Sequence, residues 1–505
     1  MQDPNVMEPR ANEATSDVVD VVARLAVLTR AGDAPRVLSG RQKVVALVWI
    51  AVLAVGLVFE PLQLFIVVNA AFVVFFCAAN LMKLMLANSA LRGGSTISVG
   101  RAELDSLHDG DLPIYTILLP VYREASILDQ LIAGIASLDY PQHRLDVKLI
   151  LEEYDTETRD AVAAIELPAW FDVVVVRDIG PSGKPRACNH GLARAKGEFL
   201  VIYDAEDRPE PDQLRKAVYA FRHVDPRVVC LQAKLNYFNR THNVLTRWFT
   251  AEYSVWFDQL LPGLQLADVA IPLGGTSNHF VTERLLELKG WDPFNVTEDA
   301  DLGLRIFVAG WKTAILDTTT YEEATSRCGN WIRQRSRWVK GYMQTWLTQM
   351  RHPVRLMRMM GPKAFVMFQL FFGACTLALL LNPIYWALAA LWFATHMHWI
   401  ELAFPAPVLY AGTAGLFVGN AACVLLAVSG AFGRRNYDDV KWAFLAPFYW
   451  LLMSVAAYKA LAQLVTKPYY WEKTEHGFCL YDPGITVRNE SAGTPTRGTD
   501  VDARV

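Results

Sequence analysis

One stretch divides the chain: Trp331-Ile332-Arg333-Gln334-Arg335-Ser336-Arg337-Trp338-Val339-Lys340-Gly341. It places four cations and two tryptophans within eleven residues, just before the sequence becomes largely apolar. Arginine and tryptophan at this density are unusual in a core, because each guanidinium needs an anion, an aromatic face or water. One interpretation is a basic anchor beside a membrane. Two acidic motifs upstream, at 204–207 and 297–299, favour a binding site instead.

The composition indicates two kinds of domain. The chain has 505 residues, of which 53% are hydrophobic and 20% charged, with 15 Trp and a net charge of −3. This mixture predicts one soluble domain and one membrane domain. Without a basic excess, nucleic acid is not an expected partner. The seven cysteines are scattered and form no C-x-x-C pair, so neither a zinc site nor a disulfide framework is expected, and the thiols fit reducing cytosolic surroundings.

The N-terminal part predicts a membrane hairpin. Residues 1–40 form a polar tail, and no signal peptide is expected, since the first apolar run begins only near residue 44. Apolar runs at 44–59 and 62–86 are separated by Glu60-Pro61 and predict a transmembrane hairpin over 41–88. Its cations flank one side, at Arg36, Arg41, Lys43, Lys83 and Arg92. The positive-inside rule therefore predicts a multi-pass protein of the plasma (inner) membrane whose next domain is cytoplasmic.

The middle of the chain predicts an α/β domain over 110–344. Buried strands are expected at 114–120, 147–151, 173–176 and 199–203, with helices at 125–138 and 186–195 between them. This alternation predicts a mainly parallel sheet. Ligands of such sheets lie beyond the carboxyl ends of the strands, which here means the loops 121–124, 152–157 and 204–209.

The C-terminal part predicts further membrane helices over 364–466. Residues 345–363 are expected to form an amphipathic interface helix. The apolar run 364–399 would be ~54 Å long as a helix, too long for one straight span and short for two. With one kinked span there, one at 408–432 and an interfacial segment at 442–465, the chain has four spans and Arg434-Arg435 lies inside, which we prefer. The alternative places two spans in 364–399 and one in 442–465. A polar tail occupies 467–505 and is expected to be disordered beyond residue 484.

The motif Gln334-x-x-Arg337-Trp338, together with the two acidic motifs, resembles the signature of processive, membrane-embedded family-2 glycosyltransferases, the cellulose-synthase-like enzymes. The resemblance covers about 110–345 and is nearest to bacterial exopolysaccharide and mixed-linkage β-glucan synthases. It implies an α/β GT-A-type glycosyltransferase domain inserted between transmembrane α-helices, with amphipathic interface helices. The implied reaction is inverting, processive synthesis of a β-glucan (β-1,4 or mixed β-1,3/1,4) from UDP-glucose. The growing polysaccharide is the acceptor, and it leaves through the enzyme's own transmembrane channel.

Two other functions remain open. The first is a non-processive glycosyltransferase that glycosylates a membrane lipid. The second is a transporter with a regulatory nucleotide-binding domain, which the scarcity of charges in the predicted spans, Lys459 apart, disfavours. The sequence does not select the sugar or the linkage. No cyclic-dinucleotide-binding domain is evident, in contrast to bacterial cellulose synthases.

An inverting sugar transfer needs a base for the acceptor hydroxyl, a cation for the leaving diphosphate, and alignment of the reactants. The resemblance assigns the base to Asp299, with Glu298 orienting it. Thr297 is also well placed to cap a helix over 298–307, which would fix Asp299. Asp204 and Glu206 follow a strand and are oxygen ligands suited to Mg²⁺ or Mn²⁺. The family pattern is Asp-x-Asp, so the second ligand stays open between Glu206 and the neighbouring Asp207.

The resemblance assigns the other site residues as follows. Trp338 supports the acceptor sugar, and Gln334 and Arg337 hold polymer hydroxyls and the diphosphate. The nucleotide sugar is bound by Tyr122, Glu124, Glu153, Asp155, Lys184 and Asp204, with Tyr122 stacking on uracil. The glycine-rich segment 274–278 leads to the acceptor, and 468–477 resembles a gating loop, although an aromatic membrane anchor explains that segment equally well. His279 and the HMH run at 396–398 are expected to be internally satisfied or interfacial rather than metal ligands.

Overall fold

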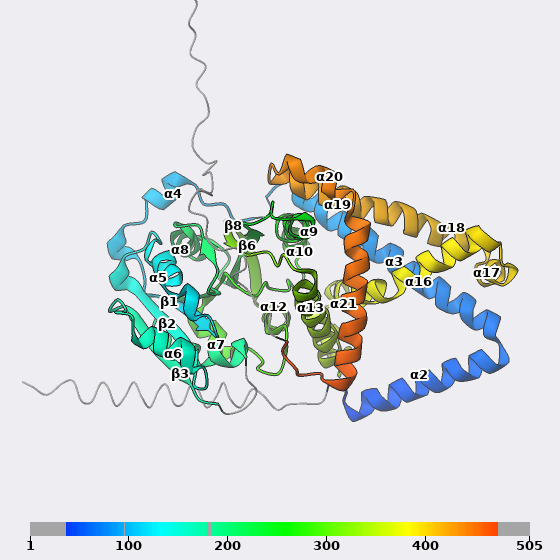
Figure 1. Cartoon of the computed structure of the whole chain (residues 1–505), viewed down its shortest axis with the longest axis horizontal. Coiled ribbons are helices and arrows are strands. Elements are labelled where there is room, and N and C mark those ends of the chain that lie inside the picture. The colour runs from blue at the N-terminus through cyan, green and yellow to red at the C-terminus, as the bar shows by residue number, and fades with distance from the viewer. Residues whose placement is uncertain (1–36, 95, 179–182, 473–505) are drawn as a thin grey trace, which may run out of the picture.

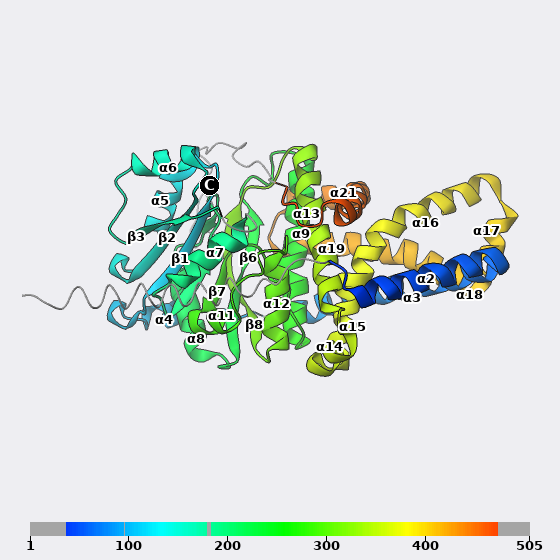
Figure 2. The same ribbon diagram turned by 90° about the horizontal axis from the view of Figure 1, so that it is seen from below.

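The computed structural model describes residues 37–94, 96–178 and 183–472. An α/β domain lies at one end and a set of long helices at the other, with α13 (Cys328–Gln349) and α21 (Ala446–Thr466) between them (Figures 1 and 2). The N-terminal tail up to residue 36, and the part of the gating-loop-like segment and tail from 473 onward, lie outside the described residues.

The α/β domain is built on one sheet with the strand order β3-β2-β1-β4-β7-β6-β8-β5. Its strands are β1 (Tyr115–Val121), β2 (Leu145–Glu152), β3 (Phe171–Val176), β4 (Phe199–Ile202), β5 (Arg208–Pro209), β6 (Val228–Tyr237), β7 (Asn278–Val281) and β8 (Lys312–Glu322). The pairs among β1 to β4 are parallel, and so is β6 with β8, whereas β7 is antiparallel to both β4 and β6. The expected α/β sheet is confirmed, but it is mixed rather than mainly parallel.

Helices cover both faces of the sheet because its strands alternate their buried side chains between two cores. The helices of this domain are α4 (Arg101–Asp105), α5 (Leu128–Ala136), α6 (Thr156–Ala163), α7 (Lys184–Ala193), α8 (Gln213–His223), α9 (Val244–Val255), α10 (Leu261–Leu266), α11 (Thr282–Glu287), α12 (Glu298–Val308) and α13. In β1, Ile117 and Leu119 belong to the core with α5 and α8, and Leu118 belongs to the core with α7, α11 and α12. Single 3₁₀ turns lie at Asp109–Asp111, Ala125–Ile127, Gln142–Arg144 and Tyr437–Asp439.

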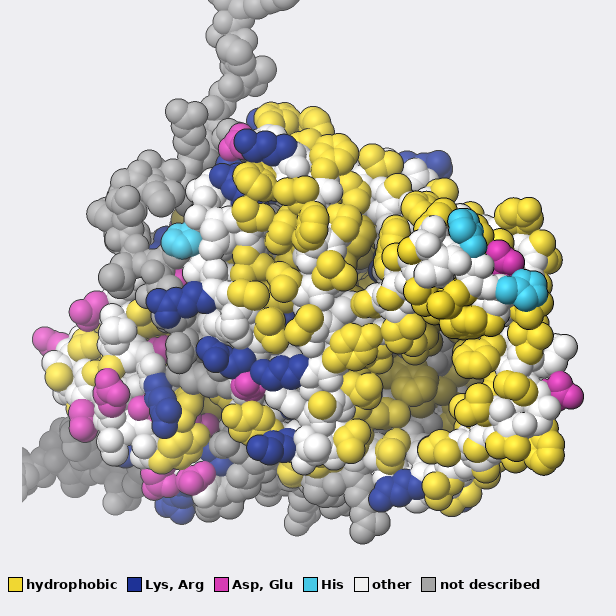
Figure 3. All heavy atoms as spheres, turned by 45° about the vertical axis from the view of Figure 1, so that its right-hand side comes forward, with side chains coloured by type: hydrophobic (Ala, Val, Ile, Leu, Met, Phe, Trp, Pro, Cys, Tyr) yellow, Lys and Arg dark blue, Asp and Glu magenta, His cyan; other side chains and the backbone are white. Residues whose placement is uncertain are grey.

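The apolar runs form long helices that carry a hydrophobic surface (Figure 3). Among the described residues, five helices are long and apolar enough to cross a membrane: 40–59, 61–91, 362–395, 406–433 and 446–466. They are built from α2 (Gly40–Phe59), α3 (Pro61–Leu91), α15 (Pro362–Phe368), α16 (Cys375–Thr395), α18 (Ala406–Ala414), α19 (Asn420–Gly433) and α21, with π-helical turns at Gln369–Ala374 and Gly415–Gly419 joining α15 to α16 and α18 to α19. Between them lie α14 (Pro353–Met360), α17 (His398–Ala403) and α20 (Val440–Ala443).

One expectation about these helices is confirmed and one changes. The run 364–399 is one long helix up to Thr395 with Pro383 inside it, as preferred, and the alternative of two helices there is wrong. The expected interface helix 345–363 is divided: α13 ends at Gln349, Pro353 begins α14, and Gly361-Pro362 separates α14 from α15. Prolines at these helix starts explain the breaks, because the ring is tolerated in a first turn and not in a helix interior.

The direction of α21 differs from that of the other long helices. It runs across α3, α16 and α18 in Figure 1 and is seen nearly end-on in Figure 2. It lies along α13 of the α/β domain, where Tyr449 of α21 bonds Arg335 of α13 at 2.8 Å. The helix α21 therefore lies beside the α/β domain and is not parallel to the other long helices.

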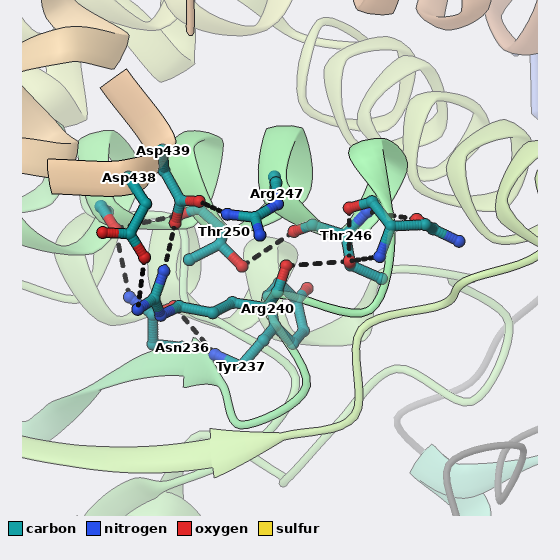
Figure 4. Close-up of polar contacts among 10 residues, drawn as sticks. Asn236, Tyr237, Arg240, Thr246, Arg247, Thr250, Asp438 and Asp439 are labelled. Carbon is teal, nitrogen blue, oxygen red and sulfur yellow. Dashed lines mark hydrogen bonds and ion pairs between the residues drawn. The ribbon is translucent and has the colours of Figure 1, made fainter. Parts of the chain in front are cut away.

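The loop after α19 is fixed to the α/β domain by ion pairs. Asp439, 2% exposed, pairs with Arg240 at 2.8 Å and with Arg247 (Figure 4). The guanidinium of Arg434 donates hydrogen bonds to both carboxylate oxygens of Asp258, at 2.7 and 3.0 Å. We call these contacts the juxtamembrane clamp. They place the end of α19 on the same side of the helices as the α/β domain.

Candidate active site

A cavity of about 720 Å³ opens at the carboxyl ends of β1, β2 and β4 and continues between the long helices. Its sheet side is lined by residues that include Tyr122, Lys184, Asp204, Glu206, Glu298 and Asp299. Its helix side is lined by residues that include Lys83, Cys375, Leu379, Cys423, Leu426 and Met453. Between the two lie Gln334, Arg337 and Trp338 of α13, so the cavity joins the predicted site to the membrane helices.

The acidic loop after β4 presents two carboxylates to the cavity. Asp204 and Glu206 line it, and Asp204 forms an ion pair with Lys184. Lys184 also donates to the carbonyl of Gly275 at 2.7 Å, which ties the loop to the glycine-rich segment. Lys184 can begin α7 here because Gly183 adopts a φ of 142°, a conformation that side chains disfavour.

Asp207 lies behind this loop rather than in the cavity. It is buried, and one carboxylate oxygen accepts from the backbone N–H of Asp204 at 2.8 Å and from the hydroxyl of Thr276. Burial, and then the neighbouring Asp204 and Glu206, hold its pKa well above the usual range. Of the two candidates for second metal ligand, Glu206 is the one that faces the cavity.

These residues fit a divalent cation held jointly with the substrate. The described residues contain no group of three His, Cys, Asp or Glu arranged to hold a metal by themselves. Two hard carboxylates beside a lysine suit Mg²⁺ or Mn²⁺, which keep waters and complete their shell with substrate phosphates. The ion pair between Lys184 and Asp204 shows that a positive charge is stabilised next to Asp204.

The loops after β1 and β2 form the far end of the cavity. Tyr122 and Tyr154 meet edge to face, with ring centroids 5.7 Å apart, and both line the cavity together with Glu124. Glu152 also lines it and bonds Arg186 at 2.5 Å.

Glu153 and Asp155 do not line the cavity, in contrast to Glu152. Glu153 is exposed, and its carboxylate accepts from the backbone N–H of Asp178 at 3.2 Å, away from the cavity wall. Asp155 is buried, caps α6, and accepts from the N–H of Arg123 at 2.5 Å. The structure thus gives Asp155 a supporting position, and direct nucleotide contacts by both acids remain predictions.

Glu298 and Asp299 begin α12 and face the cavity. Burial is the main cause of their raised pKa values, and the neighbouring Asp299 helps to bring that of Glu298 to about 7. The positive charges of Lys184 and Arg337 oppose this effect, because each lowers the pKa of both carboxyls. A carboxylate pair with raised pKa values in a cleft is typical of general acid–base sites.

Thr297 occupies the cap position of α12, but its side chain makes no capping hydrogen bond. Instead Thr297 lies against Gly341 of α13: a Cβ at 341 would be 2.2 Å from the Thr297 hydroxyl oxygen. Gly341 therefore allows α12 and α13 to approach closely. This contact sets the distance between the Glu298-Asp299 pair and the Gln334-x-x-Arg337-Trp338 motif.

The three motif residues of α13 have different surroundings. Gln334 is buried and accepts from the hydroxyl of Thr325 at 3.0 Å. Arg337 lies 5.5 Å from the ring centre of Trp471, and its guanidinium is attracted by Glu298 and Asp299, although burial lowers its pKa.

Trp338 is partly exposed to the cavity, and Tyr253 and Arg335 pack against its ring. Tyr253 stacks near it at 6.2 Å, and the guanidinium of Arg335 lies 4.6 Å from its ring centre. Arg335 is itself paired with Glu252 of α9 and bonded to Tyr449 of α21. A fixed indole with one side open is suited to stacking on an apolar face of a ligand.

The described part of the C-terminal segment, 468–472, closes one side of the cavity. Lys340, fully buried, donates to the carbonyl of Tyr470 at 2.6 Å, and Gln344 donates to that of Pro468 at 2.7 Å. Glu472 pairs with Lys459 of α21 at 2.8 Å. The aromatic pair Tyr470-Trp471 thereby lines the cavity beside Arg337.

His279 and His398 do not line the cavity, and His279 has its hydrogen-bond partners within the protein. His279 is buried, with its two ring nitrogens 2.7 Å from the Tyr115 hydroxyl and 3.3 Å from Gln213. Burial lowers its pKa to about 3, so it is neutral. His398 lies at the other end of the molecule, beside Glu401 at 3.3 Å.

The α/β domain is similar to known glycosyltransferases. Residues 113–341 match the family described as "Glycosyltransferase like family 2". The "Probable glycosyltransferase YdaM" of Bacillus subtilis is 25% identical over 237 residues, 46% of this chain and 56% of that protein. The "Beta-monoglucosyldiacylglycerol synthase" of Synechocystis sp. is 28% identical over 244 residues, 47% of this chain and 50% of that protein. The "Probable glucomannan 4-beta-mannosyltransferase 7" of Oryza sativa subsp. japonica is 27% identical over 245 residues, 46% and 41% respectively.

A solved structure is also similar: the mannosyltransferase PcManGT from Pyrobaculum calidifontis, in complex with GDP-Man and Mn²⁺. The TM-score is 0.48 at 19% identity, covering 79% of this chain and 99% of that one. The chain spans about half the length of the curated relatives it matches. The match of residues 113–341 to this family and the mixed sheet agree with a GT-A-like fold flanked by long apolar helices, which confirms the expected fold class.

Sequence reasoning missed several residues that the structure places at the site. Glu322, Tyr342 and Lys83 line the cavity, and none of them belongs to a motif. Lys83 was assigned to the flank of the N-terminal hairpin, yet it lies within α3. Its position inside an otherwise uncharged apolar run was the signal that could have found it.

Proposed function

We propose that this chain is an inverting, membrane-integrated glycosyltransferase that builds a β-glucan processively from UDP-glucose. The observation that carries the proposal is the continuous cavity, which leads from the carboxylates at the strand ends, past Trp338, to the space between the membrane helices. A donor bound at the sheet side and an acceptor entering from the helix side would meet beside Asp299. The relatives' names include β-linked glucosyl and mannosyl transfer, which supports a hexose donor.

In the proposed reaction, Asp299 takes the proton of the acceptor hydroxyl, and the freed oxygen attacks C1 of the donor sugar. The bond from C1 to the phosphate oxygen breaks, and the nucleoside diphosphate leaves with inversion at C1. Lys184 and Arg337 line the cavity and would face the departing diphosphate, and Glu298 would keep the base oriented. A divalent ion on Asp204 and Glu206 would neutralise further negative charge on the diphosphate.

The membrane arrangement follows from the same geometry. We propose four spans, formed by α2, α3, the helix 362–395 and the helix 406–433, with α21 in the interface. The crossed direction of α21 supports this count, and so does the juxtamembrane clamp, which holds the loop after α19 against the catalytic domain. The positive-inside rule then puts that domain in the cytoplasm at the plasma membrane.

The lining of the cavity favours a second candidate, transfer of a single hexose to a membrane lipid. On the helix side it is largely apolar, with Leu379, Leu426 and Met453. A polysaccharide offers hydroxyls that need partners, whereas a lipid chain is suited to such walls.

The test measures product size with the full-length protein in lipid nanodiscs and radiolabelled UDP-glucose. Processive synthesis yields high-molecular-weight material that grows with time and is degraded by a β-1,4- or mixed-linkage-specific glucanase. A product of one sugar on an extractable lipid would replace the polymer proposal with the second candidate. Failure to transfer any sugar from any nucleotide sugar would overturn both.

Trp338→Ala tests the acceptor platform in the same assay. Stacking on an aromatic ring contributes about 1–3 kcal/mol in the comparable case of nucleic-acid bases. We expect elongation to fail while UDP-glucose binding stays near normal. Trp346→Ala is the matched control, since Trp346 lies on the same helix outside the described lining and bonds Gln369 at 2.9 Å. Polymer of normal length from Trp338→Ala would remove this residue from the acceptor site.

A further inference from the structure

The helix side of the cavity contains a cation that the proposed chemistry does not use. Lys83 is the single charged residue of α3, a helix of 31 residues, and it lines the cavity. Its neighbours there are the thiols of Cys375, which is within hydrogen-bonding reach, and Cys423. Of the described residues, none is a carboxylate paired with Lys83 at ion-pair distance. An ammonium inside a helix bundle is costly without an anion.

The carboxylate that attracts Lys83 from further away is already occupied. Glu252 is paired with Arg335 and accepts from the hydroxyl of Tyr449. It therefore belongs to the support of Trp338 and is not free to neutralise a second cation. The positive charge of Lys83 faces the cavity without a matching negative group from the described chain.

The depth of Lys83 indicates where its anion would lie. It precedes the end of α3, at Leu91, by eight residues, which corresponds to about 12 Å of helix. The same part of α3 packs on the catalytic domain: Met82 and Leu86 join the core that contains Leu261 of α10. Lys83 thus lies near the level at which the bundle meets the domain, where lipid head groups are found.

The walls around Lys83 define the rest of the ligand. Leu379 of α16, Leu426 of α19 and Met453 of α21 are apolar and offer no hydrogen bonds to a sugar chain. Towards the sheet the cavity leads to Tyr342, which interacts electrostatically with both Cys375 and Asp299. A molecule that fits this path has an anionic group for Lys83, apolar chains for the walls, and a hydroxyl that reaches the base.

We propose that the helix side of the cavity binds a phosphate-bearing membrane lipid, whose phosphate lies on Lys83 and whose hydroxyl-bearing head group is the acceptor that starts each product. This inference rests on the proposed function in one respect, that acceptors reach Asp299 from the helix side. It applies to both candidates, because the lipid is either glycosylated once or serves as the primer of a polymer.

Binding is tested first, independently of catalysis. The full-length protein in an uncharged detergent is titrated with phosphatidylglycerol, with diacylglycerol of the same chains and with inorganic pyrophosphate, and bound species are read by native mass spectrometry. We expect phosphatidylglycerol to bind wild type at least tenfold more tightly than Lys83→Met, and Lys83→Arg to stay within about threefold of wild type. Diacylglycerol should bind more weakly and equally to all three proteins.

The matched control is Lys441→Met, which removes the same charge from an exposed juxtamembrane lysine outside the described lining. It should bind phosphatidylglycerol as wild type does, and UDP-glucose binding should be equal in all variants, which shows that they are folded. Equal phosphatidylglycerol binding by Lys83→Met and wild type would overturn the proposal. So would displacement of the lipid by equimolar pyrophosphate, because the site would then take a soluble phosphate.

The acceptor role is tested next with radiolabelled UDP-glucose. Wild type and Lys441→Met should form a labelled product that contains lipid phosphate, either as an extractable lipid or at the start of a polymer, and Lys83→Met should lose at least nine-tenths of it while retaining donor binding. A labelled lipid formed equally by Lys83→Met would overturn the acceptor assignment. If wild type transfers no sugar at all, the proposed function fails, and the lipid titration still decides the binding site by itself.

Discussion

Replacing Gly341 by alanine should separate catalytic geometry from stability. The added Cβ would lie 2.2 Å from the Thr297 hydroxyl oxygen and 2.3 Å from its methyl carbon, about 1 Å closer than ordinary van der Waals contact. The contact cannot be relieved by a flexible side-chain end, since all three nearest atoms belong to Thr297, the residue before Glu298. The start of α12 must therefore move away from α13. Overpacking of this kind costs about 1–3 kcal/mol of folding stability.

The effect on turnover should be larger than the effect on stability. A displacement of about 1 Å between reacting groups can lower a rate about 10²-fold. We expect Gly341→Ala to reduce kcat by about that factor, with the KM for UDP-glucose nearly unchanged, because the donor loops are not touched. The assay is initial-rate sugar transfer by purified protein, beside thermal unfolding of the same sample.

A second substitution makes the test specific. Thr297→Gly removes the clashing atoms and is tolerated at a helix cap at a cost of a few tenths of a kcal/mol. The double variant should recover most of the lost turnover, and the two changes should be strongly non-additive, as expected for residues in contact. Gly433→Ala, at a glycine whose added Cβ would meet nothing within 4 Å, is the control for the glycine-to-alanine change. Wild-type turnover in Gly341→Ala, or equal loss in the double variant, would refute the reasoning.

Three further outcomes are expected. Asp299→Asn should lower kcat about 10²–10⁴-fold with donor binding retained, since it removes the proton acceptor and little volume; near-wild-type turnover would assign the base to another carboxylate. Excess EDTA should abolish transfer, Mg²⁺ or Mn²⁺ should restore it, and Asp204→Ala should be inactive but folded; full activity in EDTA would contradict a metal at Asp204. Activity should rise with pH through about 7, because burial and Asp299 raise the pKa of Glu298 to about 7 and the pair holds a proton below it. Glu298→Gln should move that rise to lower pH, and a pH profile of kcat that is the same in both proteins would exclude this pair as its cause.

The regular parts of the fold were predictable because their signals are local. The runs at 114–120 and 199–203 are apolar, short and bounded by polar turns, and they form β1 and β4 within about one residue. The reversal of β7 was not predictable in this way. Its pairing depends on β4 and β6, which are 79 and 50 residues upstream at their starts, and no local property of 278–281 records it.

The site was predictable to the level of loops and not of side chains. Asp204, Glu206, Asp299 and Trp338 do meet in one cavity. Neighbouring acids on the same loop take different roles, however: Asp207 turns inward to hold its own loop. Which carboxylate faces the cavity is decided by partners distant in sequence, such as Thr276 for Asp207, and composition cannot show that choice.

The juxtamembrane clamp has a consequence for how the protein is made. Asp439 follows Arg240 by 199 positions and Arg247 by 192, so a ribosome finishes the catalytic domain long before the residue that anchors it exists. Until then two arginines beside the membrane lack their carboxylate. Tyr449, which braces Trp338, and the segment 468–472, which closes the cavity, emerge later still. The parts of the chain that complete the lining of the cavity are therefore synthesised last, after the α/β domain and most of the long helices.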